Sequence, residues 1–515
     1  MGCICGFSSF AEVYVYMTCI LLGISMLMPV NALTSAPSYV MNYYKYVTGN
    51  EHATPNSPVF WANILTFYNL ASVVTQAICG PTVLTPWSRK LSLTLRFTLA
   101  LSLMMLELLV ILVMPTGHVS QTGAMVSFFI VTIAAGAGKS YEEATCYALV
   151  GTMPPKFMSA IMFGCGLSGV IASILQCIIK ASMKDDYDST LHQAYIYFSL
   201  ALAFMTVALT MALSLRWNSY AQEKVGEFRA LRRAQHQQEE EGTQEKDAQA
   251  VRNAELHALD EGVRDTSDER QPYYGEATAA QPTGEVYGNI VMDDKNKEEK
   301  LRNKAAGIDG SDEGTEDDEV RVVRGDAVAD GDDDSSFDDR NLTTSQQMQR
   351  TKAWPVMKMI WPVMLACFIN FFVSLFIFPS LIIPIDREDK WFATIAILLY
   401  NCGDASGRFS SSLRFLWPSR KVLLIGSSCR SIFIPLTFLC IYNYIPGHPA
   451  PYVFMALLGL TNGFFGASAM VLGPMDSRLR TEGQRVMAGQ LMGVALLCGA
   501  SVSALLALLV VLFIP

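Results

Sequence analysis

Apolar runs long enough to cross a lipid bilayer recur along the 515-residue chain. A transmembrane helix needs about 20 mostly apolar residues, and runs of that length alternate here with short polar connections. A long polar stretch divides the runs into six before it and five after it. The predicted spans are residues 13–35, 59–80, 91–114, 123–151, 157–180, 191–215, 357–383, 391–416, 422–444, 452–473 and 486–513.

The runs predict an all-α polytopic membrane protein with eleven transmembrane helices, because only helices and closed barrels satisfy the backbone inside lipid. We expect an N-terminal bundle of six helices at residues 1–215 and a loop at residues 216–355. A C-terminal bundle of five helices follows at residues 356–515. The first run is too long for a cleavable signal peptide and has no basic segment before it, so it is interpreted as the first span.

Charge is concentrated in the polar stretch. Residues 216–353 contain 33 acidic and 19 basic residues, so the net charge of −9 arises there and the remainder is slightly basic. Few apolar residues accompany the acidic blocks, which predicts a mostly disordered loop.

The short connections on the side of this loop carry more Lys and Arg than those opposite. This bias predicts a cytoplasmic N-terminus and loop, with an extracellular C-terminus.

The eighth run contains an acid and a base in apolar surroundings. Asn401, Asp404 and Arg408 share one face of a helix, because residues three and four apart are neighbours there. A charge at mid-membrane costs roughly 2.5 kcal/mol or more, so such residues usually face a bundle interior or a wet cavity. The pattern favours a substrate site. The alternative is a self-neutralising pair that fixes two helices together.

The fourth run contains Lys139, Glu142 and Glu143 at the same helical spacing. The lysine can pair with either glutamate, which leaves one carboxylate without a partner. Proton coupling requires an intramembrane acid that titrates near physiological pH, so these residues are candidates for it. A three-residue network that only holds helices together is the alternative.

Three further features place polarity or close packing inside the spans. Pro29 frees a backbone carbonyl in the first span, and Asn31 needs a partner there; gating, substrate contact and a plain interhelical hydrogen bond all stay open. Arg430 in the ninth span needs a carboxylate or carbonyl, which favours a gating or structural ion pair. The glycines of residues 164–169 predict close helix packing.

Cysteine and histidine positions give no sign of a metal site. The twelve cysteines lie mostly in apolar runs without paired spacing, and the six histidines fall in loops or at helix ends. We therefore expect neither a metal nor a cofactor. The sequence also has no Gly-x-Ser-x-Gly nucleophile turn, which makes an enzyme the least favoured class.

Taken in order, these motifs resemble the equilibrative nucleoside transporter family. Pro29-Val30-Asn31 is similar to the family's Pro-Trp-Asn, and residues 401–408 are similar to its Asn-x-x-Asp-x-x-Gly-Arg. Residues 151–169 are similar to its fourth-to-fifth helix signature, and 430–436 and 459–474 to its ninth and tenth helices. The stretch 42–46, followed by Phe60-Trp61, is similar to the protozoan branch.

The resemblance implies a major-facilitator-like pair of helix bundles with the site between them. Asp404 and Arg408 would bind the ribose hydroxyls, and Asn401 would help. Glu143 stands where the family has a glutamine that binds the base, and Val30 stands where it commonly has a tryptophan. These two departures leave the base selectivity open and suggest proton coupling through Glu143.

The expected function is transport of purine nucleosides across the plasma membrane by alternating access, with nucleobases and protons as further candidate ligands. A nucleobase carrier is the alternative, in which the Asp404/Arg408 pair is structural and Glu143 is the main ligand. A channel or receptor is the alternative from another class. Membrane lipid is an expected partner and nucleic acid is not.

Overall fold

The computed structural model describes residues 7–264 and 350–511, except residues 84, 185, 387, 388 and 390. Regular structure in the described residues is helical. The predicted disorder of the loop concerns mainly residues 265–349, which lie outside the described residues.

The N-terminal half, residues 7–224, consists of long helices joined by short ones. Its helices are α1 (Phe10–Ser35), α2 (Pro37–Met41), α3 (Tyr43–Thr48), α4 (Pro58–Ala62), α5 (Ile64–Thr82), α6 (Pro86–Arg89), α7 (Leu93–Val113), η1 (Met114–Gly117), α8 (Gln121–Val150), α9 (Pro155–Ser182), α10 (Tyr187–Ser214), η2 (Leu215–Trp217) and α11 (Ser219–Lys224).

The C-terminal half, residues 350–511, follows the same plan. Its helices are α15 (Ala353–Ile377), η4 (Ile383–Ile385), α16 (Phe392–Ser410), η5 (Arg414–Leu416), α17 (Arg420–Cys429), η6 (Arg430–Ile432), α18 (Phe433–Ile441), α19 (Pro449–Leu472) and α20 (Glu482–Val511).

Several long helices begin where the sequence supplies a cap. The side chains of Ser9, Ser92 and Ser120 accept hydrogen bonds from backbone N–H groups in the first turns of α1, α7 and α8. Each cap satisfies one of the donors that a helix start leaves free. Pro155 begins α9, where the missing N–H of proline costs no hydrogen bond.

A charged helix, α12 (Gly226–Arg264), follows the N-terminal half as a separate element. The chain leaves helical geometry at Asn218 and again at Val225, so α12 does not continue the sixth span. The chain forms two compact units, residues 1–239 with 338–515, and residues 240–337. Both halves and the first turns of α12 therefore belong to one unit.

Those first turns are fixed at two points. The Glu227 carboxylate accepts from the Leu93 backbone N–H at 2.9 and 3.0 Å, which caps α7. Burial raises the pKa of the Glu227 carboxyl, and the Leu93 N–H and the nearby Arg96 oppose that rise. Arg229 forms a 3.3 Å ion pair with Glu482 at the start of α20. The beginning of α12 therefore contacts both halves.

In the described part of the chain, nine helices are long and apolar enough to cross a membrane. The sequence predicted eleven spans, and the other two correspond to α5 and α16, each of 19 residues. Both contain polar side chains, among them Gln76 in α5 and Asp404 in α16. Apolarity alone therefore supports nine spans, and the count of eleven stays a prediction.

Large apolar side chains cover the outside of the bundle. On α7, exposed residues recur along the whole helix, including Leu99, Leu106 and Val113. Soluble proteins seldom expose apolar surface so continuously, whereas lipid is a suitable solvent for it. The protein is a multi-pass membrane protein.

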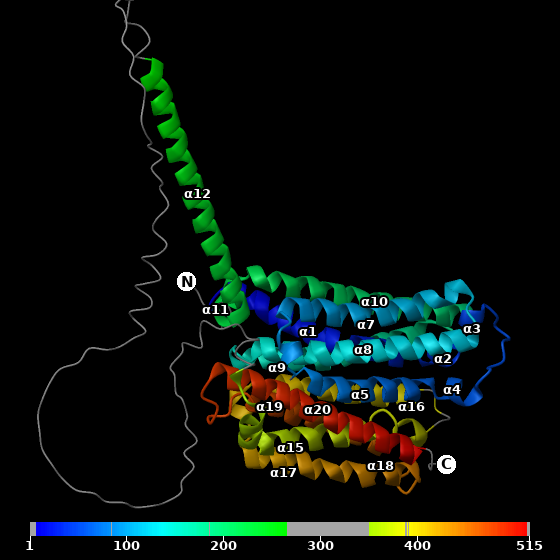
Figure 1. Ribbon diagram of the computed structural model, residues 1–515. Coiled ribbons are helices and arrows are strands. Elements are labelled where there is room, and N and C mark those ends of the chain that lie inside the picture. The colour runs from blue at the N-terminus through cyan, green and yellow to red at the C-terminus, as the bar shows by residue number, and fades with distance from the viewer. Residues whose placement is uncertain are drawn as a thin grey trace, which may run out of the picture. The chain divides into compact units, whose positions relative to one another are not determined.

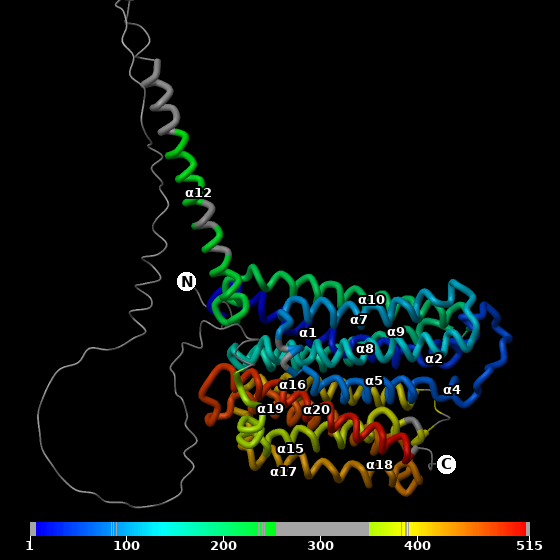
Figure 2. Tube along the Cα trace, in the orientation of Figure 1, coloured from blue at the N-terminus to red at the C-terminus, as the bar shows by residue number. Residues whose placement is uncertain are grey.

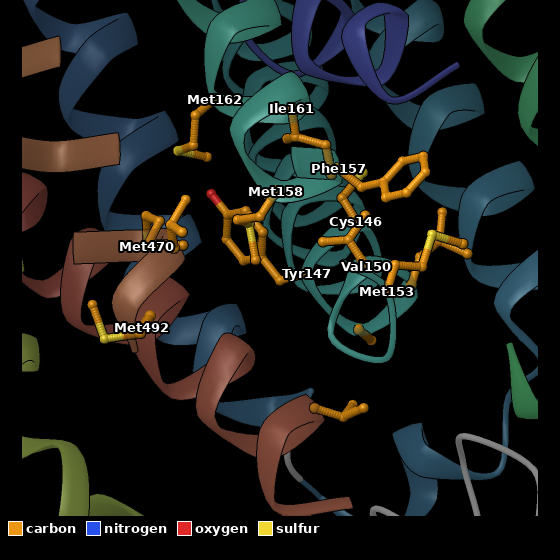
Figure 3. Packing of buried hydrophobic residues seen from close by; sticks show 14 of the residues in the cluster. Cys146, Tyr147, Val150, Met153, Phe157, Met158, Ile161, Met162, Met470 and Met492 are labelled. Atoms are coloured by element: carbon orange, nitrogen blue, oxygen red, sulfur yellow. The ribbon is translucent and has the colours of Figure 1, made fainter. Parts of the chain in front are cut away.

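The two halves lie side by side, with their helices running along one common direction (Figures 1 and 2). Helices α5, α8 and α9 of the N-terminal half contact α16, α19 and α20 of the C-terminal half. One buried apolar cluster is shared between the halves. Figure 3 shows Met470 and Met492 of the C-terminal half on the side of this cluster that faces Tyr147 and Met158 of the N-terminal half.

Helix α9 packs closely against α1 and α16. A Cβ on Gly164 would overlap the Ile20 carbonyl oxygen of α1, and one on Gly166 would lie 2.8 Å from the Cα of Ala405 on α16. Real Cβ atoms do not approach backbone so closely. The packing role predicted for these glycines is confirmed.

Candidate functional site

The Asp404/Arg408 pair lies at the interface between the halves. Arg408 Nε donates to Asp404 Oδ2 at 2.6 Å, one turn apart on α16 as predicted, and each residue is 6% exposed. Arg408 Nη1 also donates to the Met162 carbonyl of α9 at 3.4 Å. A charge-assisted bond in such a dry environment is strong, and it places a carboxylate and a guanidinium where the two halves meet.

The second oxygen of Asp404 has its own donor. Asn462 Nδ2 on α19 donates to Asp404 Oδ1 at 2.7 Å. Both carboxylate oxygens are therefore hydrogen-bonded, one to a cation and one to an amide. Each oxygen still has a free acceptor direction, since a carboxylate offers about four lone-pair sites.

Asn401 connects the halves one turn earlier on α16. Its Nδ2 donates to Ser173 Oγ at 2.7 Å and to the Gly169 carbonyl at 3.3 Å, both on α9. Still earlier, Lys180 Nζ on α9 donates to Thr394 Oγ1 at 3.0 Å. The halves thus contact each other along the helix before Asp404 as well as after it, where Arg408 meets α9.

Glu143 lies on α8 and lines a pocket between α5, α8 and α20. Its Oε1 accepts from the Tyr147 hydroxyl at 2.7 Å. The charges of Lys139 and Arg408 both act on Glu143, which links it electrostatically to the pair on α16. Asp404 and Arg408 do not line this pocket, whose walls include Gly80, Glu143, Gln490, Gly493 and Leu497. The site is therefore assigned from its charged groups and not from the pocket.

The expected pairing of Lys139 with a neighbouring glutamate is wrong for the described structure. No ion pair of Lys139 is found within 4.0 Å there. Glu142 turns instead toward α1, where its Oε1 accepts from Ser25 Oγ at 2.5 Å, while Glu143 bonds to Tyr147. The carboxylates find hydroxyl donors in different directions, so helical spacing alone did not decide their partners.

A third carboxylate near Lys139 is not identified by the sequence pattern. Glu107 lies on α7 and is 2% exposed, and its charge acts on Lys139 together with those of Glu142 and Glu143. No charged residue stands three or four positions from it, so the spacing argument did not find it. A single acid in the middle of an apolar run was the available signal.

The first-span candidates contact other parts of the N-terminal half, and their predicted roles in gating and substrate binding stay predictions. Asn31 Nδ2 donates to Ser168 Oγ on α9 at 2.5 Å, which is the interhelical hydrogen bond left open above. Val30 is half-buried against the apolar cluster of this half. Pro29 lies inside α1, which stays continuous around it. The hydrogen bond of Asn31 leads to α9 and not to the charged pair on α16.

Arg430 is held by neutral acceptors. Its guanidinium donates to the Asn370 backbone and side-chain oxygens, Ser374 Oγ, the Leu458 carbonyl and Thr461 Oγ1. All of these lie on α15 and α19 of its own half. The expected carbonyl partner is present, whereas the expected ion pair is not found among the described residues. These contacts of Arg430 stay within the C-terminal half, and its gating role stays a prediction.

The described residues contain no cluster of three or more His, Cys, Asp or Glu side chains that could hold a metal ion. The chemistry of the site is therefore derived from hydrogen bonds and charge. A buried carboxylate, a guanidinium and an amide at an interface between two halves can bind a neutral polar solute and release it again.

Comparison with known proteins assigns the chain to a family. The family model described as "Nucleoside transporter" matches residues 127–270 and 292–512. "Nucleoside transporter 1" from Crithidia fasciculata is 32% identical over 503 residues, covering 97% of this chain and 94% of that protein. "Adenosine transporter 1" from the same organism is 32% identical over 504 residues, with the same coverage.

Among solved structures, the fold is similar to that of the major facilitator superfamily proton:xylose symporter XylE bound to 6-bromo-6-deoxy-D-glucose. The TM-score is 0.54 at 14% identity, over 96% of this chain and 87% of that one. At this identity the likeness shows the fold, and the predicted major-facilitator-like architecture is confirmed. The protein is a transporter and not an enzyme, and the chain belongs to the equilibrative nucleoside transporter family, in its protozoan branch.

Proposed function

We propose that the protein carries purine nucleosides across the plasma membrane by alternating access, with Asp404 and Arg408 binding the ribose. The observation that carries the proposal is the buried ion pair at the interface between the halves. A carboxylate accepts from two vicinal hydroxyls, and an arginine donates to sugar or ring acceptors. Asn401, one turn away, adds an amide that already binds across the interface.

The carrier mechanism follows from the position of these groups. Asn401 and Arg408 both contact α9, so rocking of the halves changes the surroundings of the site directly. A substrate that enters from one side of the membrane replaces these contacts and stabilises the form in which the halves are closed. Its release on the other side of the membrane lets the halves return to the first form. Uptake of radiolabelled nucleosides tests this scheme. The rate should saturate with concentration, and it should rise when the cells already contain unlabelled nucleoside.

A nucleobase carrier is the second candidate. It is favoured by the hydrogen bonds that already engage both oxygens of Asp404, since a saturated pair can be purely structural. Glu143, which bonds to Tyr147 on α8, is then the main ligand. Free hypoxanthine that competes with adenosine uptake as strongly as inosine does supports this candidate; weak competition favours the nucleoside carrier.

We also propose eleven spans, with α5 and α16 completing six helices before the loop and five after it. Helices at the centre of such a bundle contact protein on most sides and can contain polar residues that lipid would not accept. The proposed topology has a cytoplasmic N-terminus and loop and an extracellular C-terminus. Accessibility of tags at the two termini in intact cells checks it.

Proton coupling through Glu143 forms part of the proposal. The carboxylates of Glu107, Glu142 and Glu143 all act on the single Lys139. Three acids around one base carry a charge imbalance that a bound proton reduces, so these groups are expected to titrate as a coupled set. Among them, Glu143 also senses the charge of Arg408 and lines the pocket.

We expect Glu143→Gln to flatten the pH dependence of uptake, because glutamine keeps the shape and the hydrogen-bonding oxygen but cannot bind a proton. Initial uptake rates between about pH 5.5 and 8, with and without a protonophore, measure the effect. Glu142→Gln is the comparison within the coupled set: Glu142 faces Ser25 on α1, so its loss is expected to shift the pH profile without flattening it. An unchanged profile in Glu143→Gln removes this carboxylate from the role.

We expect shortening of the loop between about residues 235 and 346 to leave uptake intact. The deletion spares Glu227 and Arg229, which fix the start of α12 to α7 and α20. A matched variant, Glu227→Gln in the full chain, weakens the cap of α7 and is expected to lower the amount of folded protein instead. Lost uptake in a correctly delivered shortened chain contradicts the interpretation of this segment as a linker.

A further inference from the structure

Polar side chains of α15 and α19 form a connected buried network that ends at Asp404. Asn370, Ser374 and Asn462 are between 0% and 3% exposed, and Arg430 is 2% exposed. Asn370 Nδ2 donates to Asn462 Oδ1 at 3.0 Å, and Ser374 Oγ donates to the same oxygen at 2.7 Å. Buried polar groups of this kind are costly unless all of them are paired, and here each is paired.

The chemistry of the two ends fixes the direction of every bond in the network. Arg430 can only donate, and it donates to Asn370 Oδ1 and to Ser374 Oγ. Asn370 and Ser374 are thereby left to donate onward to Asn462 Oδ1. The amide of Asn462 then has only its Nδ2 to present to Asp404, at 2.7 Å. A flipped Asn462 would place donor against donor on one side and acceptor against acceptor on the other.

This directed network acts on the orientation of Asp404. Arg408 donates to one carboxylate oxygen and Asn462 to the other. The two donors come from different helices, α16 and α19, so together they fix the plane of the carboxylate.

We propose that Asn462 is a positioning residue, anchored by Arg430 through Asn370 and Ser374, that holds the Asp404 carboxylate oriented for ligands with vicinal hydroxyl groups. The inference rests on the proposed function, since it assumes that Asp404 binds the ribose. Asn462 acts through Asp404. The preference for ribose over sugars that lack the hydroxyl groups therefore depends on a residue of α19.

A packing role for the same network predicts a different result. If the hydrogen bonds only hold α15 and α19 together, loss of Asn462 lowers the amount of active protein and affects every substrate equally. If Asn462 positions Asp404, its loss affects ligands that use the hydroxyls and spares ligands that lack them. Comparing a ribonucleoside with its 2′,3′-dideoxy counterpart separates these roles.

The variant that tests the positioning role most directly is Asn462→Asp in the full-length chain. Its carboxylate still accepts from Asn370 and Ser374, but it replaces the donor that faces Asp404 with a second acceptor. KM and Vmax for adenosine are measured with protein at the cell surface quantified, together with competition by 2′,3′-dideoxyadenosine. We expect the adenosine KM to rise roughly 10- to 100-fold, as for loss of a hydrogen bond to a charged group, with competition by the dideoxy compound little changed.

Ser374→Ala provides a second test if Asn462→Asp fails to fold. It removes one of the two donors to Asn462 Oδ1 and leaves Asn370 in place, so a rise in KM of about tenfold or less is expected, again confined to adenosine. Ser468→Ala is the matched control on α19, because the buried hydroxyl of Ser468 has no hydrogen-bond partner in the described structure. It should leave both ligands unaffected.

The possible outcomes distinguish failure of the positioning role of Asn462 from failure of the proposed ribose site. Wild-type protein without saturable adenosine uptake, or without preference for adenosine over its dideoxy form, overturns the proposed ribose site. A wild-type preference for adenosine over its dideoxy form that Asn462→Asp retains unchanged overturns the positioning role alone. A lower Vmax for adenosine at unchanged KM, with competition by the dideoxy compound also unchanged, overturns the positioning role in favour of packing.

Discussion

Asp404→Asn is expected to abolish nucleoside uptake in protein that still reaches the cell surface. Both oxygens of Asp404 accept hydrogen bonds, from Arg408 and from Asn462. The new amide must turn its NH₂ toward one of these donors, and it leaves the buried guanidinium without its counter-charge. Breaking a buried pair in this way typically costs about 3–5 kcal/mol, which corresponds to a loss of at least a hundredfold in binding.

Uptake per surface molecule, measured with surface biotinylation, is the readout for Asp404→Asn. Ser406→Ala is the matched control on the same helix, because Ser406 is exposed and its hydroxyl donates to the Cys402 carbonyl one turn back. The control is expected to transport like the wild type. Wild-type kinetics in Asp404→Asn would refute the assignment of the sugar site to α16.

Gly463→Val is expected to prevent correct assembly of the C-terminal half. A Cβ on Gly463 would overlap the Asp404 carbonyl oxygen and lie 2.7 Å from the Arg408 backbone nitrogen. A Cβ on Gly407 would overlap Leu460 in the same way, so α16 and α19 meet backbone to backbone. Overpacking usually costs about 1–3 kcal/mol, and here rigid backbone would have to move, which places the effect at or above that range.

The readout for Gly463→Val is the monodisperse fraction of detergent-solubilised protein in size-exclusion chromatography, together with its melting temperature. Gly489→Ala on α20 is the control, because its nearest neighbour would be the Tyr147 carbonyl oxygen at 3.3 Å, a contact that a small shift relieves. A stable, monodisperse Gly463→Val protein would contradict the close approach of the two helices. Lost uptake alone would not distinguish this effect from damage to Asp404.

Hydropathy predicted the membrane class and most of the spans, because each lipid-facing helix must be apolar on its own. It was weaker for α5 and α16, which the structure places at the interface between the halves. It also did not anticipate that the ninth run is a succession of α17, η6 and α18, with Arg430 in the short 3₁₀ turn. Burial against protein decides these details, and burial depends on neighbours that are distant in sequence.

Helical spacing worked where both partners lie on one helix and failed where a distant helix offered a better partner. Asp404 and Arg408 pair as expected. Lys139 does not pair with Glu142 three residues later, because Ser25 on the distant helix α1 provides a hydroxyl donor to that carboxylate. The sequence likewise did not identify the partners of Arg430, because its acceptors lie on helices that are distant along the chain.

By itself, the sequence determined the membrane class, the family and the charged pair on α16, because apolar length and i, i+4 spacing are local properties. Only the tertiary structure decided which groups surround that pair. Asn462 was part of a motif, yet its role follows from the 2.7 Å contact that α19 makes when glycines let it approach α16. The directed network back to Arg430 exists because buried donors and acceptors must all be satisfied at once, and that condition is met only in the folded chain.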